Sequence, residues 1–278
     1  MQPQIITAFR ITRPTNCFIG GLSIAVAAVI AGPVASWLPV AFAVLSGMLF
    51  TAAANTINDY FDIDIDRVNR PDRPLPSGLA SLQFAKMLAI ILFVCGIFFS
   101  IFINIFAICI AILSTILLIS YSARLKRTVL WGNAAVSLMT AIAFIYGALA
   151  AGRWRDGLIP AVYAFLFHFG REILKDMEDV AGDAAAKVQT FPIRFGHLPA
   201  LKIITSVYTV LATLTIIPYV LGIYNLAYLV TVIIGVDFVL AVVLALLWLQ
   251  RERANLRLLS GILKADMIVG LLAVYIGK

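Results

Sequence analysis

Charged residues are scarce in this chain of 278 residues: Asp, Glu, Lys and Arg together make up 13%, whereas hydrophobic residues make up 62%. The mean hydropathy of +1.01 lies far above the range of soluble globular domains, which excludes that class. Cysteine is also rare, and Cys17, Cys95 and Cys109 lie in apolar stretches without paired spacing, so a disulfide framework is not indicated. With only two histidines, His168 and His197, a zinc site is not indicated either.

Long apolar runs are what the chain has in abundance. A membrane-spanning helix needs about 20 predominantly apolar residues. Nine such stretches can be placed, approximately over residues 16–37, 38–58, 80–101, 103–122, 131–151, 158–176, 198–221, 225–248 and 255–277. Backbone groups in lipid must be paired within their own segment, and these runs lack the alternation of barrel strands. The sequence therefore predicts an all-α integral membrane bundle of nine transmembrane helices, with residues 1–278 forming a single domain.

The basic residues predict the orientation of this bundle. With nine spans, 18 of the 21 Lys and Arg residues fall on the side of the N-terminus, and only Arg153, Arg155 and Lys278 fall on the other. Cytoplasmic loops carry the excess of Lys and Arg, so we expect the N-terminus inside and the C-terminus outside. Anionic lipid headgroups facing these loops account for the net charge of +7, and no nucleic-acid partner is required.

The acidic residues are concentrated in two short segments that follow the second and sixth predicted spans. Each segment carries three aspartates at positions i, i+3 and i+7: Asp59, Asp62 and Asp66 in the first, and Asp176, Asp179 and Asp183 in the second. On a continuing helix each trio forms one stripe, and both stripes would face the cytoplasm. Two like charges at 4 Å repel by about 4 kcal/mol at an effective dielectric constant near 20, so cations must lie between the trios. Oxygen ligands of this kind suit Mg²⁺, which combines one or two carboxylates with substrate phosphates.

Other charged residues give further expectations. Basic residues beside the acids indicate a phosphate-bearing substrate, although contact with lipid headgroups is the alternative for each of them. We expect Asp64 and Glu178, which lie off the two stripes, to be solvated loop charges. Within the predicted spans, Asp237 and Lys264 are expected to form an ion pair, because a charge at the bilayer centre is costly unless it faces the interior; Asp266 has no assigned role.

The motifs NDxxDxxxD at residues 58–66 and DxxDxxxD at residues 176–183, together with the YSARLKR loop, resemble the UbiA superfamily of intramembrane prenyltransferases. The resemblance extends over nearly the whole chain. It implies a central cavity in which the six aspartates bind the diphosphate of a polyprenyl donor through Mg²⁺. It also implies that Asn58 helps to position ligand or water, and that Tyr121 and Lys126 contact the diphosphate. Arg67, Arg73 and Arg171 are candidates for contact with the phosphate of the acceptor.

Three further stretches, DRVNRPDRPLPSG, REILKDMEDVAGD and TFPIRFG, resemble the digeranylgeranylglyceryl phosphate synthases within this superfamily. This resemblance implies transfer of a geranylgeranyl group from its diphosphate to the free hydroxyl of the lipid-like geranylgeranylglyceryl phosphate, on the cytoplasmic side of the cell membrane. An enzyme that prenylates an aromatic acceptor is one alternative. A membrane transporter is another, although transporter sites lie near the midplane and these acids cluster at one face.

Overall fold

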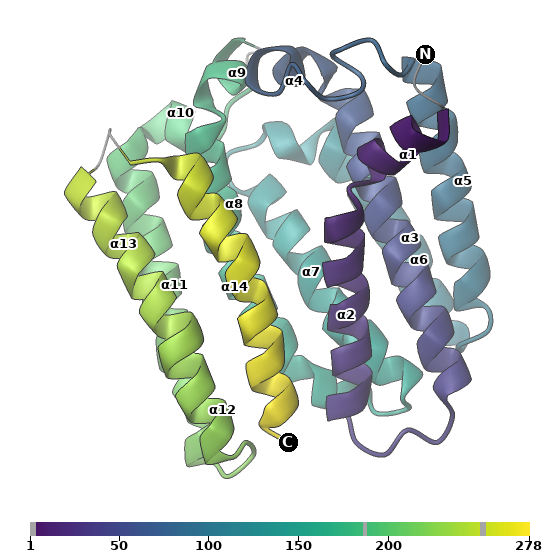
Figure 1. The fold of residues 1–278 in the computed structure, drawn as a ribbon, viewed down its shortest axis with the longest axis vertical. Coiled ribbons are helices and arrows are strands. Elements are labelled where there is room, and N and C mark those ends of the chain that lie inside the picture. The colour runs from purple at the N-terminus through teal and green to yellow at the C-terminus, as the bar shows by residue number, and fades with distance from the viewer. Residues whose placement is uncertain (1–3, 186–187, 251–253) are drawn as a thin grey trace.

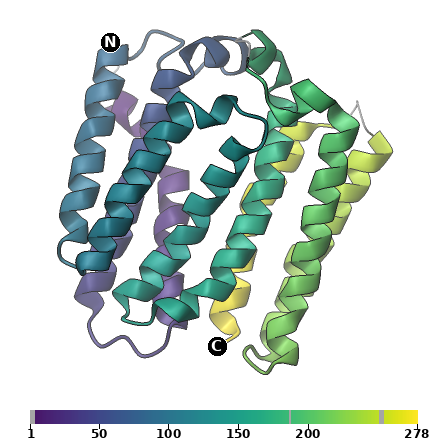
Figure 2. The same cartoon turned by 180° about the vertical axis from the view of Figure 1, so that it is seen from behind.

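The computed structural model describes residues 4–185, 188–250 and 254–278, and within these ranges the chain folds into helices and loops without a strand. Lys187, Arg251 and Arg253, which belong to the 18 basic residues counted on the side of the N-terminus, lie outside the described residues. The long helices stand side by side and roughly parallel, as the opposite views in Figure 1 and Figure 2 show. The architecture is thus the all-α bundle predicted from the apolar runs.

The long helices follow the predicted spans closely. They are α2 (Pro14–Ile30), α3 (Trp37–Phe61), α5 (Leu82–Ser100), α6 (Ile105–Ala123), α7 (Trp131–Ala150), α8 (Leu158–Glu178), α11 (His197–Val220), α12 (Leu226–Thr231) with its continuation α13 (Phe238–Gln250), and α14 (Leu256–Ile276). Eight helical units in the described part of the chain are long and apolar enough to cross a membrane. A ninth is added if α1 (Gln4–Thr12) and α2, which meet at 54°, count as one span.

Local sequence explains where two of these helices begin and end. The split between the third and fourth predicted spans is confirmed, because the Asn104 side chain accepts a hydrogen bond from the Ala107 N–H at 2.9 Å and caps the start of α6. The first predicted span is wrong at its C-terminal end: α2 stops at Ile30, seven residues earlier than expected. Gly32 follows with a φ of +119°, a conformation that glycine adopts readily and other residues rarely.

The eighth span contains an irregularity that its apolar sequence does not reveal. Between α12 and α13, the residues Val232–Asp237 form a π-helical segment, η3. Such segments often mark functional sites. Asp237 is the last residue of this segment, and its side chain lies inside the bundle near α11.

Two short helices lie across one end of the bundle and contact each other: α4 (Ile63–Asn69), which follows α3, and α9 (Val180–Ala185), which follows α8. Figure 1 shows them side by side at the top of the view, whereas α14 ends at the opposite end. α4 and α9 carry the last aspartates of the two motifs. The two acidic segments therefore lie at the same end of the molecule, as the sequence predicted.

Packing fixes the two helices that lead into these segments. α8 packs against α7, α11 and α14, and the side chains of Ile173 and Leu174 on its inner face are fully buried. α3 packs against α2 and α5, with Ser46 donating a hydrogen bond to the Gly96 carbonyl at 2.8 Å and lying 3.1 Å from the Tyr146 hydroxyl. Close approach through small residues and interhelical hydrogen bonds is the usual way in which helices associate in lipid. Both helices thereby hold their C-terminal ends in fixed positions.

Candidate active site

A cavity of about 600 Å³ lies between the helices beneath α4 and α9. One end of it is polar and is lined by residues of both acidic motifs. The remainder is lined mainly by apolar side chains of α2, α3, α6 and α7, among them Ile19, Phe50, Leu118, Val136 and Met139. The cavity therefore joins a charged end to an apolar interior.

The first motif does not form a continuous helical stripe. α3 ends at Phe61, and Asp62 is its C-cap, with φ −97° and ψ 9° and its N–H bonded to the Asn58 carbonyl at 2.9 Å. α4 then begins at Ile63. In spite of this break the three aspartates are buried together, with exposures of 2% for Asp59, 3% for Asp62 and 4% for Asp66. Asp62 and Asp66 line the cavity, whereas Asp59 lies beneath Arg13 and Arg73.

Basic side chains compensate each buried carboxylate of this motif. Asp59 pairs with Arg13, Asp62 pairs with Lys126, and Arg73 donates to Asp66 at 2.6 Å. Burial by itself would lower the pKa of Arg73 and of Lys126, but the neighbouring carboxylates outweigh it and raise both pKa values. The two basic groups are therefore fully charged, as contact with a phosphate-bearing ligand requires.

Asn58 and Arg13 also have defined geometry. The Asn58 side chain donates a hydrogen bond to Asp62 at 2.7 Å and so orients that carboxylate. Arg13 lies at the bend between α1 and α2 and has a φ of +53°, a left-handed conformation that is uncommon outside glycine. Its guanidinium reaches Asp59, so the bend brings a positive charge to the base of the motif.

The second motif repeats the helix break of the first. α8 ends at Glu178, and Asp179 is its C-cap, with φ −93° and ψ 5° and its N–H bonded to the Lys175 carbonyl at 2.9 Å. Asp176 accepts a hydrogen bond from the Asn133 amide of α7 at 2.8 Å. Asp183, on α9, has one carboxylate oxygen that is buried without a hydrogen-bond partner.

The electrostatics of Asp183 favour a cation beside it. Burial raises its pKa to about 6, with Asp179 and Asp62 adding to the effect and Lys126 opposing it. A carboxylate in this position is ionised most readily when a further positive charge lies next to it. This property matches the expectation of a metal ion between the two motifs.

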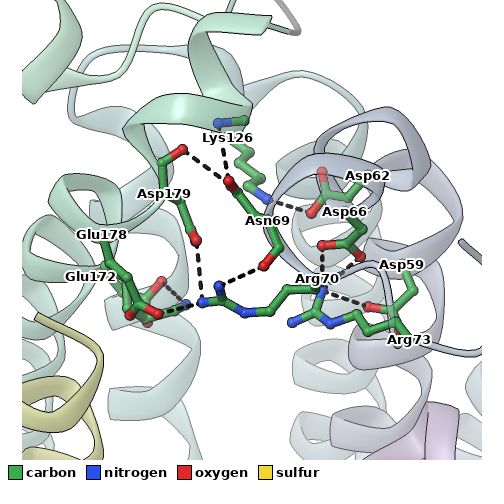
Figure 3. Close-up of polar contacts among 12 residues, drawn as sticks. Asp59, Asp62, Asp66, Asn69, Arg70, Arg73, Lys126, Glu172, Glu178 and Asp179 are labelled. Carbon is green, nitrogen blue, oxygen red and sulfur yellow. Dashed lines mark hydrogen bonds and ion pairs between the residues drawn. The ribbon is translucent and has the colours of Figure 1, made fainter.

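Asn69 and Arg70, at the end of α4, join the two motifs directly. The Asn69 amide donates to the Asp179 carbonyl at 3.1 Å, and its oxygen accepts from the Gly182 N–H at 3.0 Å. Arg70 pairs with Glu178 at 2.6 Å and lies 3.2 Å from an Asp179 oxygen. Figure 3 shows these two side chains between the acids of the first motif and those of the second. We call this pair of residues the Asn69–Arg70 clasp.

Most of the predicted site residues meet in this cavity. Five of the six aspartates line it, as do Asn58, Tyr121, Lys126, Arg73 and Arg171. Arg67 does not: its side chain is 61% exposed and pairs with Asp64, so its expected contact with substrate is not supported by its position. The expectation that Asp64 is solvated is confirmed. Glu178 is not solvated, since its side chain is 11% exposed and holds Arg70.

The predicted ion pair between Asp237 and Lys264 is wrong. Asp237 instead accepts a hydrogen bond from the Thr215 hydroxyl of α11 at 3.1 Å. Lys264 lines the cavity and has no carboxylate partner among the described residues. Asp266 lines a smaller, mostly apolar chamber that adjoins the cavity near His168 and Met267.

Sequence reasoning missed several residues of the site. Asn69 and Arg70 lie at the end of α4, just after the first acidic motif, yet their hydrogen-bond partners are 108 to 113 residues away in the sequence. Asn133 gave no signal, being one polar residue at the start of an apolar run. Glu172 precedes the second aspartate trio by one turn, and its spacing alone indicates no role. Lys264 was expected only as an ion-pair partner of Asp237, not as a residue of the cavity.

The acids fit Mg²⁺ as part of a mixed coordination sphere. Within the described residues no three His, Cys, Asp or Glu side chains are arranged so that they alone could hold a metal ion. Mg²⁺ does not need such a cage, because it retains waters and combines one or two carboxylates with substrate phosphates. Asp183 has a buried oxygen without a hydrogen-bond partner, the buried oxygen of Asp179 contacts Arg70 at 3.2 Å, and both residues line the cavity together with Asp62 and Asp66. The donor set thus fits a metal ion that is shared with a phosphate ligand.

Comparisons with known proteins agree with this geometry. The sequence model of the UbiA prenyltransferase family matches residues 20–265. A digeranylgeranylglyceryl phosphate synthase of Methanopyrus kandleri is 39% identical over 264 residues, covering 95% of this chain and 96% of that protein. The enzyme of the same name from Methanothermobacter thermautotrophicus is 34% identical and covers 100% and 96%.

Solved structures show the same fold. A structure described as that of digeranylgeranylglyceryl phosphate synthase superposes with a TM-score of 0.79 at 31% identity, covering 99% of this chain and 98% of the other. A UbiA homologue from Archaeoglobus fulgidus, bound to DMAPP and Mg²⁺, superposes with a TM-score of 0.68 at 19% identity, covering 96% and 99%. At that identity the likeness concerns the fold alone.

Proposed function

This chain belongs to the UbiA prenyltransferase family, and from that membership we propose that it is a digeranylgeranylglyceryl phosphate synthase. It transfers a geranylgeranyl group from geranylgeranyl diphosphate to the free hydroxyl of geranylgeranylglyceryl phosphate, which forms the second ether bond of archaeal-type membrane lipids. The names of relatives that are 39% and 34% identical over nearly the whole chain support this choice of donor and acceptor. The transporter alternative has no support from these relatives.

The polar end of the cavity is the site for the donor diphosphate. Asp62, Asp66, Asp176, Asp179 and Asp183 face this end and would hold Mg²⁺ together with the diphosphate oxygens. Bound Mg²⁺ supplies charge neutralisation of the departing diphosphate. Asp59 contributes indirectly, because it holds Arg13 and Arg73 at the base of the site.

Basic and polar side chains complete the diphosphate site. Lys126 and Arg73 carry positive charge at the cavity wall, and Tyr121 also lines the cavity. Preorganised charges directed at a leaving group stabilise the negative charge that develops there. Asn58 keeps Asp62 oriented, since its amide donates to that carboxylate. Arg67 is left out because it lies on the exposed side of α4.

The apolar remainder of the cavity suits an allylic cation. When the bond between the allylic carbon and the diphosphate oxygen breaks, its electron pair leaves with the diphosphate. The acceptor hydroxyl then donates a lone pair to the allylic carbon and releases its proton, which the departing diphosphate can accept. Side chains such as Phe50, Leu118 and Met139 exclude water, which would otherwise hydrolyse the cation, and give the prenyl chain an apolar surface.

The observation that carries this proposal is the meeting of the two acidic motifs in one cavity through the Asn69–Arg70 clasp. The test is a turnover assay on purified protein with labelled geranylgeranyl diphosphate and either geranylgeranylglyceryl phosphate or a hydroxybenzoate, with Mg²⁺ or EDTA. We expect ether product only with the lipid acceptor and Mg²⁺. Product only with the hydroxybenzoate would assign an aromatic acceptor instead.

We further propose that the active site opens on the cytoplasmic side of the cell membrane. The excess of basic residues on the side of the N-terminus supports this orientation. α4 and α9 would then lie at the cytoplasmic face, in contact with membrane lipids at their edges. The orientation can be tested with a cysteine introduced at exposed Val68 and a membrane-impermeant thiol reagent. We expect the reagent to label this cysteine in opened membranes but not in intact cells.

A further inference from the structure

Lys264 is unusual among the basic residues of the cavity. Every other Lys or Arg side chain in the cavity lining has a carboxylate within 4 Å. These pairs are Arg13 with Asp59, Arg70 with Glu178, Arg73 with Asp66, Lys126 with Asp62, and both Arg171 and Lys175 with Glu172. Lys264, half-buried on α14, has neither an ion pair nor a hydrogen bond to another described residue.

The contacts of α8 with α14 place Lys264 beside two further cations. The Arg171 side chain donates a hydrogen bond from Nε to the Ser260 carbonyl at 3.3 Å, and Lys264 follows Ser260 by one helical turn. Lys175 follows Arg171 by one turn on α8. Arg171, Lys175 and Lys264 all line the cavity, and we call them the α8–α14 basic wall.

Positive charges outnumber negative ones along the two helices of this wall. Glu172 is the carboxylate that pairs with Arg171, at 3.4 Å, and with Lys175, at 2.9 Å. Asp176, one turn after Glu172 on α8, also lines the cavity. Three positive charges against these two negative ones leave an excess of one. His168, one turn before Arg171, also lines the cavity, and both of its buried ring nitrogens lack a hydrogen-bond partner. Unpaired cationic and polar groups inside a membrane bundle are costly, so they indicate a bound anion.

The donor diphosphate does not account for this excess. The first acidic motif, with Arg73 and Lys126, lies on the α3 and α4 side of the cavity, whereas the basic wall lies on α8 and α14. The two sites adjoin at Asp176, the first aspartate of the second motif, which follows Lys175 on α8. The donor diphosphate and the acceptor phosphate must both enter this cavity during the reaction, and each needs its own compensating charge. A phosphate monoester carries about −1.5 to −2 charges at pH 7, so it supplies the anionic partner that Lys264 lacks among the described residues.

We propose that the α8–α14 basic wall binds the phosphate monoester of the acceptor and that Lys264 makes a direct contact with it. This inference rests on the proposed function and adds to it the place of the acceptor headgroup. The phosphate is held on α8 and α14, opposite the first acidic motif, and the glycerol hydroxyl then faces the donor. Lys264 is a specificity residue in this arrangement, because it distinguishes a phosphorylated acceptor from a neutral one.

The experiment combines a binding assay with steady-state kinetics on three variants in detergent without phospholipid. Lys264→Gln removes the charge, Lys264→Arg keeps it, and Lys202→Gln is the matched control, since Lys202 is exposed on α11 outside the cavity. Binding of geranylgeranylglyceryl phosphate without donor is measured by thermal shift. The KM values for acceptor and donor are measured separately, and unphosphorylated geranylgeranylglycerol serves as the neutral acceptor.

We expect Lys264→Gln to weaken acceptor binding and raise the acceptor KM about ten- to a hundredfold, as loss of a charge-assisted hydrogen bond implies. The donor KM should stay within about twofold, and use of the neutral acceptor should be unchanged. Lys264→Arg should retain most of the affinity, and Lys202→Gln all of it. An acceptor KM for Lys264→Gln equal to that of the wild type, or an equal rise in the donor KM, would overturn the proposal.

The two proposals can fail separately. If the wild type binds the phosphorylated lipid through Lys264 but forms no ether product, the basic wall stands and the proposed function falls. If the wild type forms product and Lys264→Gln is unaffected, the function stands and the basic wall falls. A membrane phospholipid headgroup could supply the same phosphate chemistry. In that case phosphatidylglycerol would compete with the acceptor, and increasing its content in nanodiscs would raise the acceptor KM of the wild type but not of Lys264→Gln. This result would assign the basic wall to the phospholipid headgroup instead.

Discussion

Substitution of Asn69 tests whether the two acidic motifs must be held together. Asn69→Ala removes both hydrogen bonds between α4 and the second motif, those to the Asp179 carbonyl at 3.1 Å and from the Gly182 N–H at 3.0 Å. Each such bond contributes a net of about 0.5–1.5 kcal/mol, so the pair contributes roughly 1–3 kcal/mol. If that energy favours the closed arrangement of the site, the apparent affinity for diphosphate and Mg²⁺ should fall roughly 5- to 150-fold.

Asn225→Ala is the matched control for this experiment. The Asn225 side chain also makes two hydrogen bonds to backbone, to the Ile276 carbonyl at 2.8 Å and from the Tyr228 N–H at 3.0 Å, but it lies at the opposite end of the bundle. The two variants should lose similar thermal stability. Only Asn69→Ala should raise the KM for geranylgeranyl diphosphate and the Mg²⁺ concentration needed for half-maximal rate.

The assay is steady-state turnover with the Mg²⁺ concentration varied at fixed donor, and the donor concentration varied at saturating Mg²⁺. Thermal unfolding in the same detergent supplies the stability reference. Equal kinetic losses in the two variants would show that general destabilisation is the cause. Unchanged kinetics in Asn69→Ala would show that the clasp does not contribute to the site, and the reasoning would be refuted.

Three further predictions concern the same site. Asp62→Ala and Asp179→Ala should each lower turnover at least about a hundredfold. The circular dichroism of both purified variants should remain that of the helical wild type. If either variant kept near-normal, Mg²⁺-dependent activity, the substituted residue would not belong to the metal site. Gly182→Ala should lower turnover, because the added Cβ would lie 2.4 Å from the Asn69 amide nitrogen. The same substitution made in the Asn69→Ala variant should lower turnover little further, since the clash is then absent. Equal losses of turnover in both backgrounds would show that the effect does not come from this contact. Dialysis against EDTA should abolish formation of the ether product, and added Mg²⁺ should restore it. The product is measured by chromatography, and turnover that persists in EDTA would contradict the metal assignment.

The spans could be predicted because a chain that crosses lipid must pair its backbone groups within a helix, and such a helix needs a long run of apolar residues. The sequence displays these runs directly. The aspartates could be predicted because carboxylates are rare in this chain and their spacing repeats. Asn69 and Asn133 could not be predicted, since each acts through a partner that only the packing of distant helices brings near. The ion pair expected for Lys264 failed for a related reason: a charge within a span indicates an interior position but not the partner, and this interior is a cavity.

The two motifs also show how a spacing can be informative while its simplest geometric interpretation is wrong. A continuous helix would have placed each aspartate trio on one straight stripe, but in both motifs the helix ends at the middle aspartate, Asp62 or Asp179, and a short helix follows. Both breaks have nearly the same backbone angles and the same hydrogen bond from the N–H to the carbonyl four residues earlier. The break redirects the chain across the end of the bundle, and α4 thereby reaches α9. If both helices continued straight, each third aspartate would lie further along the axis of its own helix. The paired breaks bring them to the lining of one cavity, so the repeated spacing corresponds in both motifs to a helix, its C-cap and a second, short helix.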